Sequence, residues 1–327
     1  MIAFLVRRIL SALPALVGVT LVAFFVLNLL PSDPVQIWSG GSALSAEAAG
    51  RLRSELGVER GPAARYAAWA LALLRGDLGH SLRDGRPVAS VIGDALPWSL
   101  ALNLCAVLAI YGVAVPLGLV GASSPGSTAD RAAGWALLLL YAVPPFAAAL
   151  LLQQWVAVGL GWLPLQGVSA EGGSPAGRAW DLLRHLVLPT LCLALSGWAV
   201  VARYSRAAFR STIGREFLSV ARAKGLSRLR AHLYLAAGTA VPFVTLLATI
   251  VPGLVGGSII VEQVFSLPGV GRLYLASVEG RDYPVVMGLT LLSAVLVLAG
   301  HLVVDLLYLL VDPRIRAALL PDKADAF

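Results

Sequence analysis

The sequence predicts an all-α integral membrane protein with six transmembrane helices. Hydrophobic residues make up 58% of the 327 residues, charged residues only 13%, and the mean hydropathy is +0.81. A soluble domain carries roughly 25% charged residues, so this balance excludes an ordinary soluble protein. A helix needs roughly 20 apolar residues to cross the hydrocarbon core, and six runs of about that length occur.

The six predicted spans follow one another along the chain. They are residues 9–30, 97–121, 132–158, 186–202, 236–261 and 284–310. The first run ends at Pro31-Ser32-Asp33-Pro34, where two prolines stop a helix. It is longer than the apolar region of a signal peptide and no small-residue cleavage site follows it, so we expect an uncleaved span.

The distribution of Lys and Arg predicts the orientation. With the N-terminus inside, the inner segments hold fourteen Lys and Arg residues, whereas the short outer loops hold only Arg178, Arg184, Arg272 and Arg281. Because positive charge accumulates on the cytoplasmic side, both termini are predicted to be cytoplasmic. The chain then divides into an N-terminal tail with the first span (1–30), an extracytoplasmic segment (31–96), a five-helix core (97–312) containing a cytoplasmic loop (203–235), and a cytoplasmic tail (313–327).

The sequence contains no recognisable motif for ATP binding, catalysis or metal binding. Its two lysines, Lys224 and Lys323, stand in no phosphate-binding loop, so any ATP must be bound by another chain. Cys105 and Cys192 fall inside predicted spans and are expected to be buried as small apolar residues. The histidines have no metal-ligand spacing, so neither catalytic nor metal-binding residues are predicted.

An ion-coupled secondary carrier is an alternative class. Such a carrier needs ionisable groups near the bilayer midplane, and the predicted spans are almost free of them. Glu262 lies at the outer end of the fifth span, where we expect its carboxylate to reach water at the interface.

The loop at residues 203–235 has a pattern that is typical of a docking surface for a soluble partner. Apolar residues recur at helical spacing and predict two short amphipathic helices, with Gly225 at the end of one and Ser227 capping the next. The small residues Ala221, Ala223 and Gly225 would allow a partner to approach closely. From the pattern alone, a docking surface and a basic loop resting on anionic lipid are equally compatible.

Motifs along the whole chain carry a resemblance to a known family. Glu216 to Leu226, with its core Ala221-Arg222-Ala223-Lys224-Gly225-Leu226, resembles the coupling motif of permease subunits of ATP-binding cassette importers. More narrowly, the chain resembles the first permease of dipeptide, oligopeptide and nickel uptake systems. The other matching motifs are Arg7-Arg8, Leu30-Pro31-Ser32-Asp33-Pro34, Arg75-Gly76-Asp77-Leu78-Gly79-His80-Ser81, His185-Leu186-Val187-Leu188-Pro189, Val264-Phe265-Ser266-Leu267-Pro268-Gly269-Val270-Gly271, Arg281-Asp282-Tyr283-Pro284-Val285-Val286, Asp305-Leu306-Leu307-Tyr308 and Asp312-Pro313-Arg314-Ile315-Arg316.

The resemblance implies the permease fold of type I importers in the inner membrane and no enzymatic activity. It implies a second homologous permease, two ATPase subunits that bind the ATP and Mg²⁺, and an extracytoplasmic substrate-binding protein. Peptides are the expected substrates, with nickel or a metal chelate as the alternative. The expected coupling residues are Glu216, Ala221, Arg222, Ala223, Lys224, Gly225 and Leu226.

Two further regions each have two possible interpretations. Leu267, Pro268 and Gly269 fit either an outer gate or a plain surface turn. Residues 31–96 either cover the pathway beside the binding protein or form a cap that stabilises the outer mouth. The chain departs from the family pattern at Tyr234 to Thr239, which puts the seating of the second half of the loop in doubt, and at His301, where the family commonly has Asn.

Overall fold

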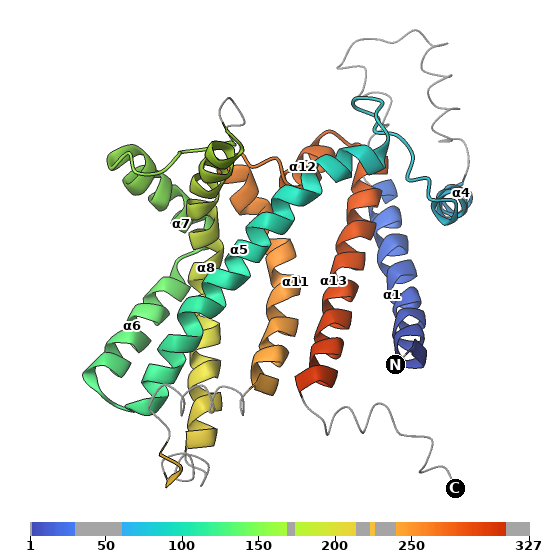
Figure 1. Ribbon diagram of the computed structural model, residues 1–327. Coiled ribbons are helices and arrows are strands. Elements are labelled where there is room, and N and C mark those ends of the chain that lie inside the picture. The colour runs from blue at the N-terminus through green and yellow to red at the C-terminus, as the bar shows by residue number, and fades with distance from the viewer. Residues whose placement is uncertain (1, 30–60, 169–173, 214–222, 226–239, 312–327) are drawn as a thin grey trace, which may run out of the picture. The chain divides into compact units, whose positions relative to one another are not determined.

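The computed structural model describes residues 2–29, 61–168, 174–213, 223–225 and 240–311, and these form an all-helical protein (Figure 1). Apart from one isolated bridge between His80 and Pro87, the regular structure in these ranges is helix. Within these ranges four helices are long and apolar enough to cross a membrane: α1 (Ile2–Leu29), α5 (Val88–Ser123), α8 (Pro175–Ile213) and α13 (Tyr283–Val311). A bent pair of helices would make a fifth span if it is counted as one. The predicted membrane class and all-α fold are confirmed, whereas the count of six spans and the cytoplasmic placement of the termini stay predictions.

The predicted third span is not one straight helix. It divides into α6 (Thr128–Ala142), α7 (Pro145–Leu152) and the π-helix η1 (Gln153–Gly159), with a bend of 98° between the two halves. Val143 and Pro144 at the break have extended backbone, with ψ of 120° and 141°. The cause is Pro144-Pro145, because a proline lacks the N–H that continues a helix and disfavours helical backbone in the preceding residue.

The fourth predicted span is too short. The helix α8 has 39 residues and includes Arg178 and Arg184, which the sequence had placed in an outer loop. At 1.5 Å per residue its length is roughly 58 Å, almost twice the thickness of the hydrocarbon core. The charged residues therefore mark where the helix leaves the apolar layer and not where it ends.

The fifth predicted span matches α11 (Ala240–Val264), which a turn connects to α12 (Val270–Glu279). The chain separates into two compact units, and α5, α12 and α13 each contribute to both. The first unit comprises residues 98–271 and 299–327, and the second comprises residues 2–97 and 272–298.

Glycines bring α5 and α8 of the first unit close together. A Cβ on Gly197 would lie 2.5 Å from Cδ1 of Ile110, and one on Gly118 would lie 2.5 Å from Cβ of Ser205. Because both contacts advance in the same direction along the two helices, α5 and α8 run parallel. The indole of Trp198 donates to the carbonyl of Ala109 over 2.9 Å, so the polar group in this contact is also satisfied.

The second unit joins α1 to α4 (Pro62–Leu74). Two described helices fall in the predicted extracytoplasmic segment, because α5 begins at Val88, ahead of the predicted start of the second span at residue 97. The hydroxyls of Thr20 and Tyr66 lie 3.0 Å apart, and the rings of Phe24 and Tyr66 meet edge to face with centroids 5.4 Å apart. Residues 30–60 lie outside the described ranges, so the rest of this segment stays a prediction.

Candidate functional site

The predicted coupling segment is described at Ala223, Lys224 and Gly225, and all three residues are exposed. Gly225 has φ +67°, the left-handed conformation that the predicted helix end requires. Among the residues that the structure describes, none has an atom within 4 Å of a Cβ placed on this glycine. Glu216, Ala221, Arg222 and Leu226 lie outside the described residues, as does the departure at 234–239, and their roles stay predictions.

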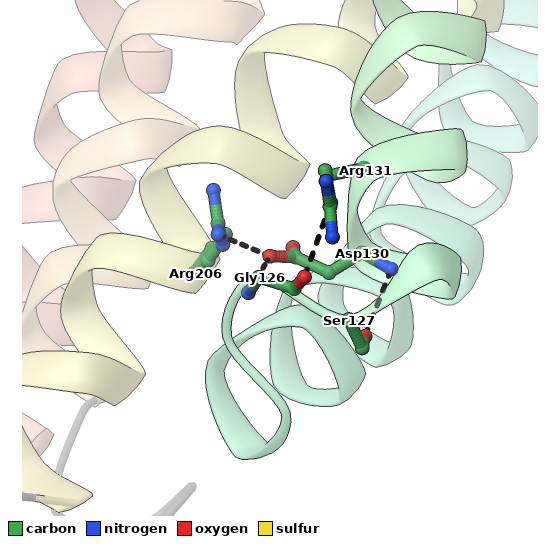
Figure 2. A network of polar contacts seen from close by, with 5 residues as sticks. All are labelled: Gly126, Ser127, Asp130, Arg131 and Arg206. Carbon is green, nitrogen blue, oxygen red and sulfur yellow. Dashed lines mark hydrogen bonds and ion pairs between the residues drawn. The ribbon is translucent and has the colours of Figure 1, made fainter.

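An ion pair fixes α8 shortly before this segment. Figure 2 shows the carboxylate of Asp130, in the first turn of α6, facing the guanidinium of Arg206 on α8. The Nη2 group of Arg206 donates to Oδ2 of Asp130, and the backbone N–H of Gly126 donates to the same oxygen over 2.9 Å. Arg206 lies about two turns before the end of α8. The connection between α5 and α6 is therefore attached to the part of α8 that leads toward the coupling segment.

Local capping holds Asp130 in place. The hydroxyl of Ser127 accepts from the backbone N–H of Asp130 over 3.2 Å and caps α6, which leaves the carboxylate turned toward α8. The Nε of Arg131 donates to the carbonyl of Gly126 over 3.1 Å and closes the other side of the turn (Figure 2). Asp130 is buried, so its charge is stabilised by these donors and not by bulk water.

Two glycines allow this pair to form. A Cβ on Gly121 would lie 2.8 Å from Oδ1 of Asp130, and one on Gly118 would lie 2.9 Å from the carbonyl oxygen of Ala202. Any larger residue would push α5 away from α6 or α8. We call the contacts among Gly118, Gly121, Asp130 and Arg206 the inner clamp.

The predicted outer gate forms a closed turn at residues 265–271. The N–H groups of Ser266 and Leu267 donate back to the carbonyls of Gln263 and Glu262, over 3.2 and 2.9 Å, and Ser266 has φ +53°. These bonds form a Schellman motif, with a serine where glycine is more common. Within the turn, Leu267 and Gly269 are buried and Pro268 is exposed.

A side chain and a backbone N–H satisfy further carbonyls at the end of α11. The amide of Gln153 donates over 3.1 Å to the carbonyls of Val264 and Leu165, and the N–H of Gly167 donates over 2.8 Å to Phe265. Gln153 is buried in the π-helix that follows the proline break. The bend at Pro144-Pro145 thus precedes the helix that supplies this capping residue.

The expectation that Glu262 reaches water is wrong. Its relative exposure is 0%, and its carboxylate accepts from the hydroxyl of Ser99 and the N–H of Gly271, each over 2.7 Å. The physical reason is that these donors replace water around the carboxylate. The location of Glu262 at the end of an apolar run could not predict its burial, because its partner Ser99 is 163 residues away in the sequence.

In the second unit, Asp282 brings two of the resemblance motifs together. Its carboxylate accepts from the hydroxyl of Ser81 over 2.5 Å and from the N–H of Leu82 over 3.0 Å. The segment after α4 is therefore anchored to the start of α13 by the buried carboxylate of Asp282.

Nearby, the N–H of Arg86 donates to Asp84 and lowers the pKa of that carboxyl, while Asp94 raises the pKa of the Arg86 guanidinium.

Within the described ranges, no group of three or more His, Cys, Asp or Glu residues could hold a metal ion. The pairing of Asp130 with Arg206, and the roles of Ser99 and Asp282, were not predicted from the sequence. One local signal existed: Ser127 three residues before Asp130 is a helix-capping pattern. It locates the carboxylate at a helix start but does not identify Arg206.

Comparison with known proteins gives matches along almost the whole chain. Residues 114–317 match the family model described as binding-protein-dependent transport system inner membrane component, and residues 1–103 match that of its N-terminal region. The chain is 33% identical to the oligopeptide transport system permease protein AppB of Bacillus subtilis, over 97% of this chain and 100% of that protein. It is 32% identical to the dipeptide transport system permease protein DppB of Escherichia coli K12, over 97% and 99%.

Proposed function

Because this chain belongs to the family of binding-protein-dependent transport system inner membrane components, we propose that it is the permease subunit of an ATP-binding cassette importer that carries peptides. The observation that carries this proposal is the match to peptide permeases over 97% of the chain. The chain is a multi-pass inner membrane transport subunit and not an enzyme. Import of nickel is not favoured, since the similar proteins named here are peptide permeases.

The geometry of the first unit supports a mechanical role for α8. This helix runs without interruption for 39 residues, and the inner clamp holds its last third against α5 and α6. In this proposal a force that reaches the end of α8 would be passed to α5 and α6 through the inner clamp. Helices that move as a connected group are what alternation between two packed states requires.

The proposed partners follow from this role. A second permease would complete the pathway, two ATPase subunits would bind ATP and Mg²⁺ and receive the coupling segments, and a binding protein would deliver the peptide from outside. In this arrangement Glu216, Ala221, Lys224 and Gly225 contact the ATPase and take no part in hydrolysis. ATP closure of the ATPases would move the coupling segments, and α8 would transmit the movement to the spans.

Substitution of Gly225 tests the coupling role. We expect Gly225→Leu to abolish ATP-driven peptide uptake in proteoliposomes while ATP hydrolysis by the complex continues, because a bulky side chain would block docking. Gly225→Asn is the conformational control, since Asn tolerates positive φ at low cost. Gly161→Leu is the control for backbone strain, because Gly161 also has positive φ and a Cβ on it would meet no atom within 4 Å.

The outcomes separate docking from backbone strain. Loss of uptake in Gly225→Leu alone supports docking at this turn. Full uptake in that variant contradicts the coupling role, and equal loss in Gly161→Leu assigns the defect to strained backbone.

Co-purification of an ATPase chain with the permease in detergent tests the partner proposal directly. Binding of short peptides and of chelated nickel to the partner binding protein tests the substrate class.

A further inference from the structure

The buried carboxylate of Glu262 organises the whole 265–271 turn. Its two oxygens face different segments: Oε1 accepts from the hydroxyl of Ser99 on α5, and Oε2 accepts from the N–H of Gly271 on α12. Its backbone carbonyl accepts from Leu267. Glu262 therefore holds the beginning of the turn through its backbone and the end of the turn through its side chain.

Ser99 completes the attachment. Its Oγ donates to Glu262 and accepts from the N–H of Val270 over 2.8 Å. Val270 and Gly271 begin α12, where the first N–H groups have no partner within the helix. A carboxylate suits this end of a helix because the helix dipole is positive there. The pair of side chains thus satisfies the first two N–H groups of α12.

Steric constraints confirm that the turn is built around the carboxylate. A Cβ on Gly269 would overlap the carboxylate of Glu262 and lie 2.6 Å from Oγ of Ser99. A Cβ on Gly271 would lie 2.6 Å from the Cα of Ile259, which is backbone and cannot move aside. Both glycines of the Pro268-Gly269-Val270-Gly271 sequence are therefore explained by close approach to α11 and to its carboxylate.

We propose that Glu262 is the positioning residue of the outer gate. Together with Ser99 it holds the 265–271 turn against α5 and α11, which keeps Leu267 buried. We call the hydrogen bonds among Ser99, Glu262, Val270 and Gly271 the latch. Leu267 is 1% exposed and packs in the hydrophobic core of the first unit. The turn would then move with α5 and α11 as one body and not as an independent flap. The role as a gate rests on the proposed function, whereas the latch is a property of the chain itself.

Cysteine labelling measures the latch without any transport assay. The full-length chain contains only Cys105 and Cys192, and replacing both with alanine gives a background for single reporters. A Leu267→Cys reporter is reacted with a water-soluble maleimide in the detergent-purified protein. We expect slow labelling in the background and labelling about tenfold faster or more after Glu262→Gln or Ser99→Ala, because each change removes buried hydrogen bonds to a charged group.

Three controls make the result specific. Glu279→Gln applies the same substitution to an exposed carboxylate, and Ser99→Thr keeps the hydroxyl, so both should leave labelling slow. A second reporter, Leu188→Cys, lies 1% exposed on α8 and should stay slow in every variant. If Glu262→Gln does not fold, the pair Ser99→Ala and Ser99→Thr decides the test.

The outcomes support or overturn the latch. Fast labelling of the Leu267 position alone supports it. Unchanged labelling after Ser99→Ala and Glu262→Gln overturns it, as does equal acceleration at the Leu188 position, which would indicate general loosening. Peptide uptake by the unaltered complex is measured separately. Absence of uptake contradicts the proposed function and leaves the labelling result intact.

Discussion

At one end of the first unit, the carboxylate of Asp130 meets a guanidinium whose side chain is still 39% exposed. At the other end, the carboxylate of Glu262 is fully buried and accepts from a hydroxyl and a backbone N–H. Both carboxylates join segments that are distant in the sequence, and both depend on neighbouring glycines. They differ in their access to water and in the mobility of their donors.

This difference suggests a division of mechanical roles. A long Arg side chain that reaches water can follow its partner through small movements and can exchange the ion pair for hydration. Asp130 also accepts from the backbone N–H of Gly126, but the flexible Arg206 is among its donors. The Ser99 hydroxyl and the Gly271 N–H that donate to Glu262 cannot follow a displaced carboxylate. The inner clamp is therefore suited to an end that moves, and the 265–271 turn to an end that keeps its geometry.

The largest effect on stability is expected at the buried end. Glu262→Ala leaves the Ser99 hydroxyl and the Gly271 N–H without this acceptor, and each buried unsatisfied group costs roughly 1–3 kcal/mol. We expect the free energy of unfolding in detergent micelles to fall by about 3 kcal/mol. Glu279→Ala, at an exposed position, should change it by less than about 0.5 kcal/mol. Equal effects of the two changes would contradict the assigned burial.

The inner clamp should show a smaller effect. Arg206→Ala leaves the Asp130 carboxylate buried without its ion pair, which costs about 3–5 kcal/mol for a fully buried pair. Because Arg206 is partly exposed, we expect about 2 kcal/mol. Arg210→Ala, one turn further along α8 and exposed, is the matched control and should have little effect.

A double variant sharpens this measurement. Asp130→Ala together with Arg206→Ala removes both charges, so it should be less destabilising than the sum of the two single changes. Additive effects would show that the ion pair contributes nothing beyond its separate side chains. Unfolding midpoints of the four proteins in one detergent provide the cycle.

Sequence patterns predicted much of the fold, because hydropathy and length follow from local composition. They located α11 and α13 to within a few residues, whereas α1 begins at Ile2, ahead of the predicted start at residue 9. Of the two cysteines expected to be buried, Cys192 is buried and Cys105 is only partly buried. They missed the break at Pro144-Pro145, since both prolines stand inside an apolar run and hydropathy does not record the loss of two N–H donors.

The contacts of the candidate site could not be predicted in the same way. Asp130 and Arg206 are 76 residues apart, and Ser99 and Glu262 are 163 residues apart. Nothing in the local pattern identifies such partners, because burial at these positions is produced by tertiary packing. The positive φ of Gly225 was predictable, since the end of a helix favours glycine in this conformation.

The contact between α5 and α8 offers a test of packing apart from charge. Gly118→Ala would place a Cβ 2.5 Å from Cβ of Ser205, and overpacking of this kind typically costs about 1–3 kcal/mol. We expect a value near the lower end, because only one methyl group is added. Gly112→Ala on the same helix, where no atom lies within 4 Å, should be neutral or stabilising. A stabilising Gly118→Ala would contradict the close approach of these helices.

The smallest effect is expected where an ion pair is exposed on both sides. Arg86 and Asp94 lie 2.6 Å apart in the second unit, and their side chains are 47% and 67% exposed. Exposed ion pairs contribute little to stability, and salt screens them. Asp94→Asn should therefore change the unfolding midpoint only slightly at low salt and not at all at about 1 M salt. The same salt series on Arg206→Ala should leave most of its effect in place, because water does not surround Asp130. If salt removed both effects equally, burial would not distinguish the inner clamp from a surface pair.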